Sequence, residues 1–110
     1  PSQLGYTTMS LDKKYLKSKP ICKVKFIAPP ELAKDAKKIY LAGDFNNWDF
    51  HETQLKRQKD GTYSTILELE AGAEYEYRYV VDGERWENDH AADKYVPSKI
   101  GNVDNSVVVV

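Results

Sequence analysis

Two long runs of alternating residues constrain the fold of this chain more than any other feature. From Tyr63 to Glu70, and again from Glu74 to Asp82, every second residue is suited to a buried face. A period of two is typical of a half-buried strand. Ala71-Gly72 turns the chain between the two runs, so we predict two separate strands. The side chains expected to point inward are those of Tyr63, Thr65, Leu67, Leu69, Tyr75, Tyr77, Tyr79 and Val81, with Glu76, Arg78 and Val80 pointing outward.

Shorter strands are predicted on either side of this pair. Residues 21–27, 39–42 and 55–58 precede it, and Asn105 to Val110 follows it. Turn signals separate the strands about every eight to twelve residues, and no long helical pattern occurs. The fold class is therefore predicted to be all-β, an antiparallel β-sandwich. Residues 31–38 are expected to form a loop with room for a short helical turn, and residues 87–101 a long polar connection.

Length and composition bound the domain organisation. A chain of 110 residues holds one hydrophobic core and is too short for two. Residues 1–20 are polar and end at Pro20, which predicts a flexible leader with one helical turn over residues 11–16, followed by a single module over residues 21–110. No apolar run approaches a membrane span, and no signal-peptide pattern opens the chain. The single Cys22 has no internal disulfide partner, so we expect a cytoplasmic protein without membrane contact.

Charge is distributed unevenly along the chain. Residues 1–38 carry nine lysines and three acidic residues, whereas the remainder carries seven basic and fourteen acidic residues. A basic segment can attract nucleic acid or anionic lipid. Because the lysines are spread over several predicted elements, with no arginine among them, we interpret them as a solvated surface and expect no nucleic-acid partner.

We find no pattern that indicates catalysis. Carboxylate pairs serve glycosidases, but sequence spacing singles out no such pair here. Asp89, His90 and Asp93 offer metal-ligand atoms, yet two carboxylates and one imidazole on a loop are usually plain surface. Phosphate-cradling glycine loops and nucleophile motifs do not occur. The chain is predicted to be a binding module and not an enzyme, with no metal and no cofactor.

Both tryptophans follow predicted strands on turns of short polar residues. The strand at 39–42 runs into Gly43, Asp44, Asn46 and Asn47 before Trp48, and Asp82-Gly83 precedes Trp86. An exposed aromatic ring serves binding or packing. Packing of Trp48 onto the rim of the core is one interpretation. Two indoles with Arg78 close by indicate another, a sugar ring stacked on indoles while polar groups bind its hydroxyls. Stacking on nucleobases, an analogous contact, contributes about 1–3 kcal/mol per ring.

The motifs resemble those of carbohydrate-binding module family 48, which includes the glycogen-binding domain of the AMP-activated protein kinase β subunit. The resemblance covers residues from about 24 to 110. It rests on Leu41-Ala-Gly-Asp-Phe-Asn-Asn-Trp-Asp49, Gly61-x-Tyr63, Tyr75-x-Tyr-Arg-Tyr-Val-Val-Asp-Gly83 with Trp86, and Asn105-Ser-Val-Val-Val109. The resemblance implies an immunoglobulin-like early-set (E-set) β-sandwich that binds α-1,4-glucan chains of glycogen or starch.

The resemblance also implies a site. In glycogen-binding members two tryptophans stack on the glucan, and they correspond to Trp48 and Trp86 here. A lysine that contacts sugar hydroxyls is replaced by Arg78, and a leucine, a threonine and an asparagine in the last loop are matched by Ile100, Asn102 and Asp104.

This chain departs from the family pattern in three places, and two other functions stay open. Arg78 stands for a lysine, Asp104 stands for an amide, and one extra residue, Glu84 or Arg85, precedes Trp86. One alternative is an accessory module beside the catalytic barrel of a family 13 branching or debranching enzyme. Another is an interaction domain in a regulatory, kinase-type complex with weak or no sugar binding, and some modules of this family keep the fold and lose the sugar.

Overall fold

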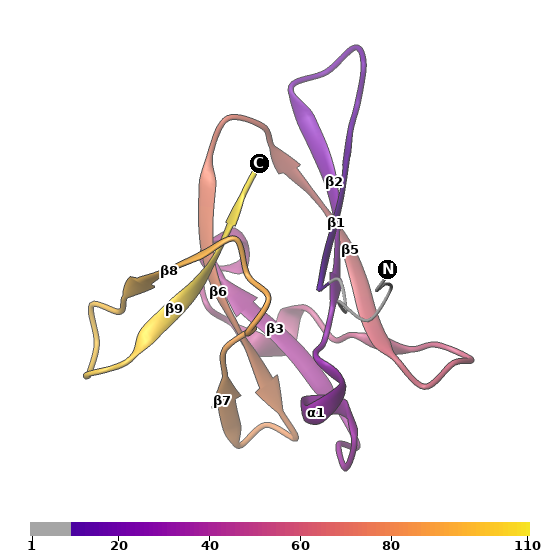
Figure 1. Ribbon diagram of the computed structural model, residues 1–110, viewed down its shortest axis with the longest axis vertical. Helices are drawn as coiled ribbons and strands as arrows, with labels where there is room; N and C mark the ends of the chain where they lie inside the picture. The colour runs from indigo at the N-terminus through magenta and orange to yellow at the C-terminus, as the bar shows by residue number, and fades with distance from the viewer. Residues whose placement is uncertain (1–9) are drawn as a thin grey trace, which may run out of the picture.

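The computed structural model describes residues 10–110, and within this range the strands form two antiparallel sheets packed as a sandwich (Figure 1). The first sheet has the order β1-β2-β5-β4, and the second the order β3-β6-β9-β8, with β7 paired to β6. Two turns of 3₁₀ helix, η1 and η2, follow β3. The elements are β1 (Leu11–Tyr15), β2 (Ile21–Ile27), α1 (Pro30–Ala33), β3 (Ile39–Gly43), η1 (Asp44–Asn46), η2 (Phe50–Glu52), β4 (Lys56–Arg57), β5 (Tyr63–Glu70), β6 (Glu74–Val81), β7 (Arg85–Glu87), β8 (Lys94–Pro97) and β9 (Asp104–Val109).

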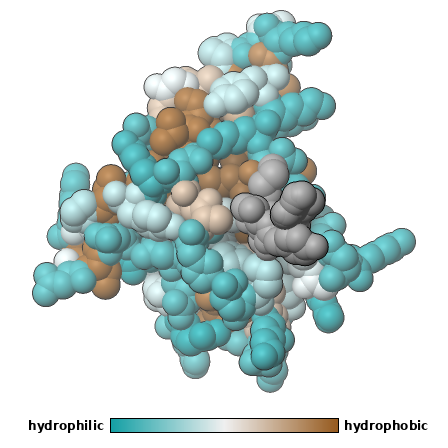
Figure 2. Space-filling view, in the orientation of Figure 1, coloured by the Kyte–Doolittle hydropathy of each residue, from teal (hydrophilic) through white to brown (hydrophobic). Residues whose placement is uncertain are grey.

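The hydrophobic core lies between the two sheets. Phe26 of β2 packs against Tyr77 of β6 with ring centroids 5.2 Å apart, and Tyr77 packs edge-on against Tyr79. Val81 and Val108 are fully buried beside them. The sequence prediction for the inward face of β6 is therefore confirmed, and so is the all-β sandwich. Hydrophilic residues cover most of the face shown in Figure 2.

The outward face of β6 differs from its prediction at one residue. Val80 points away from the core, as expected, yet it is fully buried. It lies opposite Tyr40 on β3 and opposite Trp86 on β7. Phe50 of η2 contacts the rings of both neighbours. The 3₁₀ turn therefore covers Val80, and this cover is a tertiary contact that strand periodicity does not reveal.

The helical turn expected over residues 11–16 is wrong. Leu11–Tyr15 is the strand β1, paired antiparallel with β2 from Leu11 opposite Phe26 to Tyr15 opposite Cys22. An edge strand can gain its order from backbone pairing rather than from its own pattern. Residues 11–15 of the expected leader are therefore part of the first sheet. Residues 1–9 lie outside the described residues.

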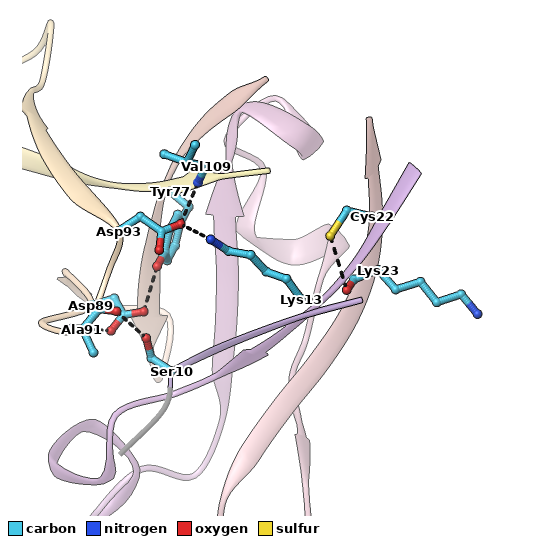
Figure 3. Close-up of polar contacts among 9 residues, drawn as sticks. All are labelled: Ser10, Lys13, Cys22, Lys23, Tyr77, Asp89, Ala91, Asp93 and Val109. Atoms are coloured by element: carbon cyan, nitrogen blue, oxygen red, sulfur yellow. Dashed lines mark hydrogen bonds and ion pairs between the residues drawn. The ribbon is translucent and has the colours of Figure 1, made fainter. Parts of the chain in front are cut away.

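Polar contacts also fasten this first strand to the second sheet (Figure 3). Lys13 donates to Asp93 at 2.7 Å, and the same carboxylate oxygen accepts from the backbone of Val109 at 2.7 Å. Ser10 donates to the carbonyl of Ala91 at 3.0 Å.

Two predicted connections contain regular structure. The short helix α1 covers the start of the expected loop over residues 31–38. The expected connection over residues 87–101 is wrong in part, since it contains the strand β8, which pairs with β9.

Candidate functional site

The loop after β3 is built around the side chain of Asn46. Its amide oxygen accepts from the backbone of Gly43 at 3.0 Å, and its amide nitrogen donates to the carbonyl of Leu41 at 2.8 Å and to Thr53 at 3.1 Å. Asn46 is buried, so these bonds satisfy groups that water does not reach. Gly43 passes close to β6, and a Cβ there would lie 2.5 Å from the carbonyl oxygen of Glu76. The loop is thus held firmly against β6.

This loop presents Trp48 in a restrained orientation. Asn47 and Trp48 both have positive φ, 55° and 60°, a conformation that a bulky residue rarely adopts. The Trp48 backbone donates to the carbonyl of Gly43 at 2.9 Å. Its indole Nε1 donates to Asp44 Oδ1 at 3.1 Å, and Asp44 Oδ2 accepts from the backbone of Glu76 at 2.8 Å. Asp44 therefore joins the indole to β6, and the ring is half-buried.

Trp86 lies on the same outer face of the second sheet. It is on β7, opposite Val80, and 41% of its surface is exposed. Phe50 packs edge-on against it, with ring centroids 5.9 Å apart. Phe50 thus supports the indole, and the exposed part of the ring is open to a ligand.

The polar floor beside the tryptophans comes from β6 and β9. Arg78 Nε donates to Asn105 Oδ1 at 2.7 Å, and Asn105 Nδ2 donates to Glu76 Oε1 at 3.0 Å. Asn105 uses both ends of its amide, so it sets the positions of the guanidinium and the carboxylate together. This leaves the terminal nitrogens of Arg78 as donors and the second oxygen of Glu76 as an acceptor, a combination suited to neighbouring hydroxyl groups.

These side chains surround one hollow of about 540 Å³. Of the six predicted site residues, Trp48, Arg78, Trp86 and Ile100 line it. Ile100 is 83% exposed on a loop closed by a bond from the backbone of Ser98 to the carbonyl of Val103. Asn102 and Asp104 are exposed and do not line the hollow. The residues that line it and that the sequence did not single out are Asp44, Glu76, Ser98, Lys99, Val103 and Asn105.

A larger hollow, of about 840 Å³, lies elsewhere, between α1, the turn after β4 and the segment that contains Ala91. Its walls include Pro29, Ala33 and Gly61, and Tyr63, which also lines it, is buried. Size alone therefore favours it, but its exposed ring is the imidazole of His90, which pairs with Glu31, and it offers a ligand no indole to stack on. The smaller hollow beside the tryptophans is the better candidate.

Several titratable groups outside this hollow make contacts that serve the structure. Burial, with the nearby Tyr79 and Asp89, raises the pKa of Tyr77 far above its ordinary value, and its hydroxyl donates to the buried Asp89 at 2.7 Å. Burial likewise raises the pKa of Tyr79. His90 pairs with Glu31 at 2.7 Å. Residues 10–110 contain no group of three or more His, Cys, Asp or Glu arranged to hold a metal ion.

A β-sandwich that presents two indoles beside a hydrogen-bonded polar floor has the architecture of a ligand-binding module, and comparison with known proteins identifies its family. The family described as the glycogen recognition site of AMP-activated protein kinase matches residues 31–110. This chain belongs to that family.

Individual relatives agree with this result. The 5'-AMP-activated protein kinase subunit beta-1 of Sus scrofa is 37% identical over 73 residues, which are 66% of this chain and 55% of that protein. The beta-1 subunit of Rattus norvegicus has the same identity over 25% of its length, and the beta-2 subunit of Mus musculus is 33% identical. The chain therefore spans about half or less of the relatives it matches. Family membership supports a carbohydrate-binding, non-catalytic role. In the described part of the chain no helix is long and apolar enough to cross a bilayer.

Proposed function

We propose that this chain is a non-catalytic module that binds α-1,4-glucan chains, such as those of glycogen or starch, with sugar rings stacked on Trp48 and Trp86. The observation that carries the proposal is that both indoles and Arg78 line one hollow. Family membership supports the same ligand class.

The chemistry of a pyranose determines which side chains would contact which part of the sugar. Its flat C–H face can cover an indole, while its hydroxyls both donate and accept hydrogen bonds. Arg78 supplies donors, Glu76 supplies an acceptor, and Asn105 holds the two in place. Ile100 offers an apolar contact at the rim. By analogy with stacking on nucleobases, each stacked sugar ring should contribute about 1–3 kcal/mol. An exposed hydrogen bond should contribute about 0.5–1.5 kcal/mol, so we expect stacking to supply most of the affinity.

The open shape of the site predicts weak binding. With two platforms and no enclosing pocket, we expect a dissociation constant between about 1 mM and 1 μM, equivalent to about 4–8 kcal/mol. Titration of β-cyclodextrin into the protein, followed by tryptophan fluorescence, tests this directly. A saturable change supports the proposal, and a flat signal up to millimolar sugar contradicts it and favours a module that keeps only the fold.

The second candidate function is that of an interaction domain in a regulatory, kinase-type complex. The relatives are named as kinase β subunits, which favours a kinase-type complex over an accessory module of a branching or debranching enzyme as the context of this chain. The two roles are compatible, because a glucan-binding module can direct a complex to its polysaccharide. The salt dependence of binding separates glucan from an anionic partner of the lysine-rich residues 1–38. A neutral glucan displaces no counterions, so its affinity should change little between low and physiological salt.

A further inference from the structure

On the outer face of the second sheet, the hollow lined by Trp48 and Trp86 (the first hollow) has a neighbour of about 560 Å³ (the second hollow). Aromatic residues Tyr40, Phe50 and His51 form one part of its wall, and Lys38, Asp82 and Glu84 are among the polar residues of the rest. Tyr40 and Phe50 are half-buried and His51 is exposed, so the rings have surface available to a ligand.

The strand register places this hollow next to Trp86. Tyr40, Val80 and Trp86 form one row across β3, β6 and β7, and residues that pair in a row share a face of the sheet. Phe50 spans the row, with its ring centroid 5.5 Å from Tyr40 and 5.9 Å from Trp86. One continuous aromatic surface therefore leads from Trp86, at the edge of the first hollow, into the second.

The second hollow has a fixed wall. Asp82 Oδ1 accepts from the backbone of Lys37 at 2.8 Å and from that of Lys38 at 2.9 Å, and the Asp82 backbone donates to the carbonyl of Lys38 at 2.8 Å. These bonds tie the start of β3 to the end of β6. A ligand would not have to order this wall, which lowers the entropic cost of binding.

The chemistry of the lining favours a neutral polyol. Tyr40 and Phe50 offer ring surface, while Lys38, Glu84 and the imidazole of His51 offer hydrogen-bond donors and acceptors at the rim. Two lysines, Lys37 and Lys38, face two carboxylates, so charge of one sign does not dominate. An anionic ligand gains little from such a set, whereas an uncharged sugar can use both its apolar face and its hydroxyls.

We propose that this second hollow is a further subsite of the glucan-binding surface, which receives the glucose units that follow those stacked on Trp86. The proposal rests on the proposed function of the first hollow. From Arg78 to Val81, the last residue of β6, the strand advances by about 10 Å, at 3.3 Å per residue, which is more than the width of one sugar ring. A chain that fills only the first hollow would leave the second free, so the subsite predicts a dependence on chain length.

Calorimetric titration of maltotriose and maltoheptaose into the full chain tests the proposal. Wild-type protein should bind maltoheptaose more tightly than maltotriose by about tenfold or more, the effect of one further stacking contact. Tyr40→Thr, which keeps a strand-favouring residue, should reduce that ratio at least threefold and leave maltotriose affinity within about twofold. Tyr15→Thr, which removes an exposed strand tyrosine of the first sheet, is the matched control and should change neither affinity.

Each other outcome overturns the proposal in a recognisable way. A length ratio that Tyr40→Thr leaves intact means that a longer chain only offers more ways to fill the first hollow. Equal wild-type affinities for the two sugars remove the subsite and leave the proposed function standing. Equal losses for both sugars in Tyr40→Thr mean that Tyr40 acts only through Trp86. If neither sugar binds the wild-type protein, the proposed function itself fails.

Discussion

The indole Nε1 of Trp48 donates a hydrogen bond to the carboxylate of Asp44, at 3.1 Å. The other oxygen of that carboxylate accepts from the backbone of Glu76, at 2.8 Å. The loop that carries the first stacking platform is therefore fixed to the strand that carries Arg78. Since a stacked sugar needs the ring in one orientation, Asp44 is a positioning residue for Trp48.

Replacing Asp44 should weaken glucan binding without unfolding the protein. We expect Asp44→Ala to lower the affinity for maltoheptaose about three- to tenfold, the effect of about one hydrogen bond. Calorimetric titration gives the affinity, and a melting curve shows that the fold persists. Asp60→Ala is the matched control, because Asp60 is an exposed aspartate that accepts from Thr62 in a turn of the other sheet. Unchanged affinity in Asp44→Ala would show that the Trp48 orientation does not need this contact.

The buried side chain of Asn46 should matter for stability more than for affinity. Asn46→Ala removes three hydrogen bonds and leaves the backbone groups of Gly43 and Leu41 without partners. We expect a loss of about 2–4 kcal/mol in the free energy of unfolding, measured with urea. Asn102→Ala, at an exposed loop position, should stay within about 0.5 kcal/mol of wild type. Similar values for the two variants would contradict the role of Asn46.

Two adjacent residues of β9 should differ in their effect on binding. Asn105 holds Arg78 and Glu76, so Asn105→Ala should lower glucan affinity about three- to tenfold. Asp104 is exposed and does not line the hollow, so Asp104→Asn should leave the affinity unchanged or raise it by at most about fivefold, equivalent to about 1 kcal/mol. Calorimetry with one oligosaccharide compares both. A tenfold loss of affinity in Asp104→Asn, with an unchanged affinity in Asn105→Ala, would mean that Asp104 and not Asn105 supports sugar binding.

The carboxylate of Asp82 gives a pH dependence of defined sign. Hydrogen bonds from the backbone of Lys38 and Lys37 lower its pKa in the folded protein. A lowered folded pKa adds stability that is present above the unfolded value, about 3.9, and is lost as pH falls through the folded value. The melting temperature of wild type should therefore exceed that of Asp82→Asn by a constant amount above about pH 5, and the gap should close below about pH 4. A gap that persists at pH 2 would rule out the charge as its cause.

The alternation of residues predicts much of the fold, because β5, β6 and β9 alternate or are valine-rich over their whole lengths. The pattern does not reveal β1, β7 and β8, since short polar strands owe their order to pairing with a neighbour. Within the candidate site, Trp48 and Trp86 stood out as aromatics on turns. Asp44, Glu76 and Asn105 did not, because their bonds depend on the register of β3, β6 and β9. A shift of one residue reverses the face of a strand, and this is the difference between Asp104 and Asn105.

The most direct test of the central claim follows the two tryptophans themselves. The chain has two, so a proton–nitrogen correlation spectrum should contain two indole Nε1 resonances, assigned with Trp48→Phe and Trp86→Phe. Titration with maltoheptaose should shift both resonances with one common midpoint, between about 1 μM and 1 mM. Saturable binding that leaves both indole resonances in place would contradict the account, because the sugar would then lie elsewhere on the protein.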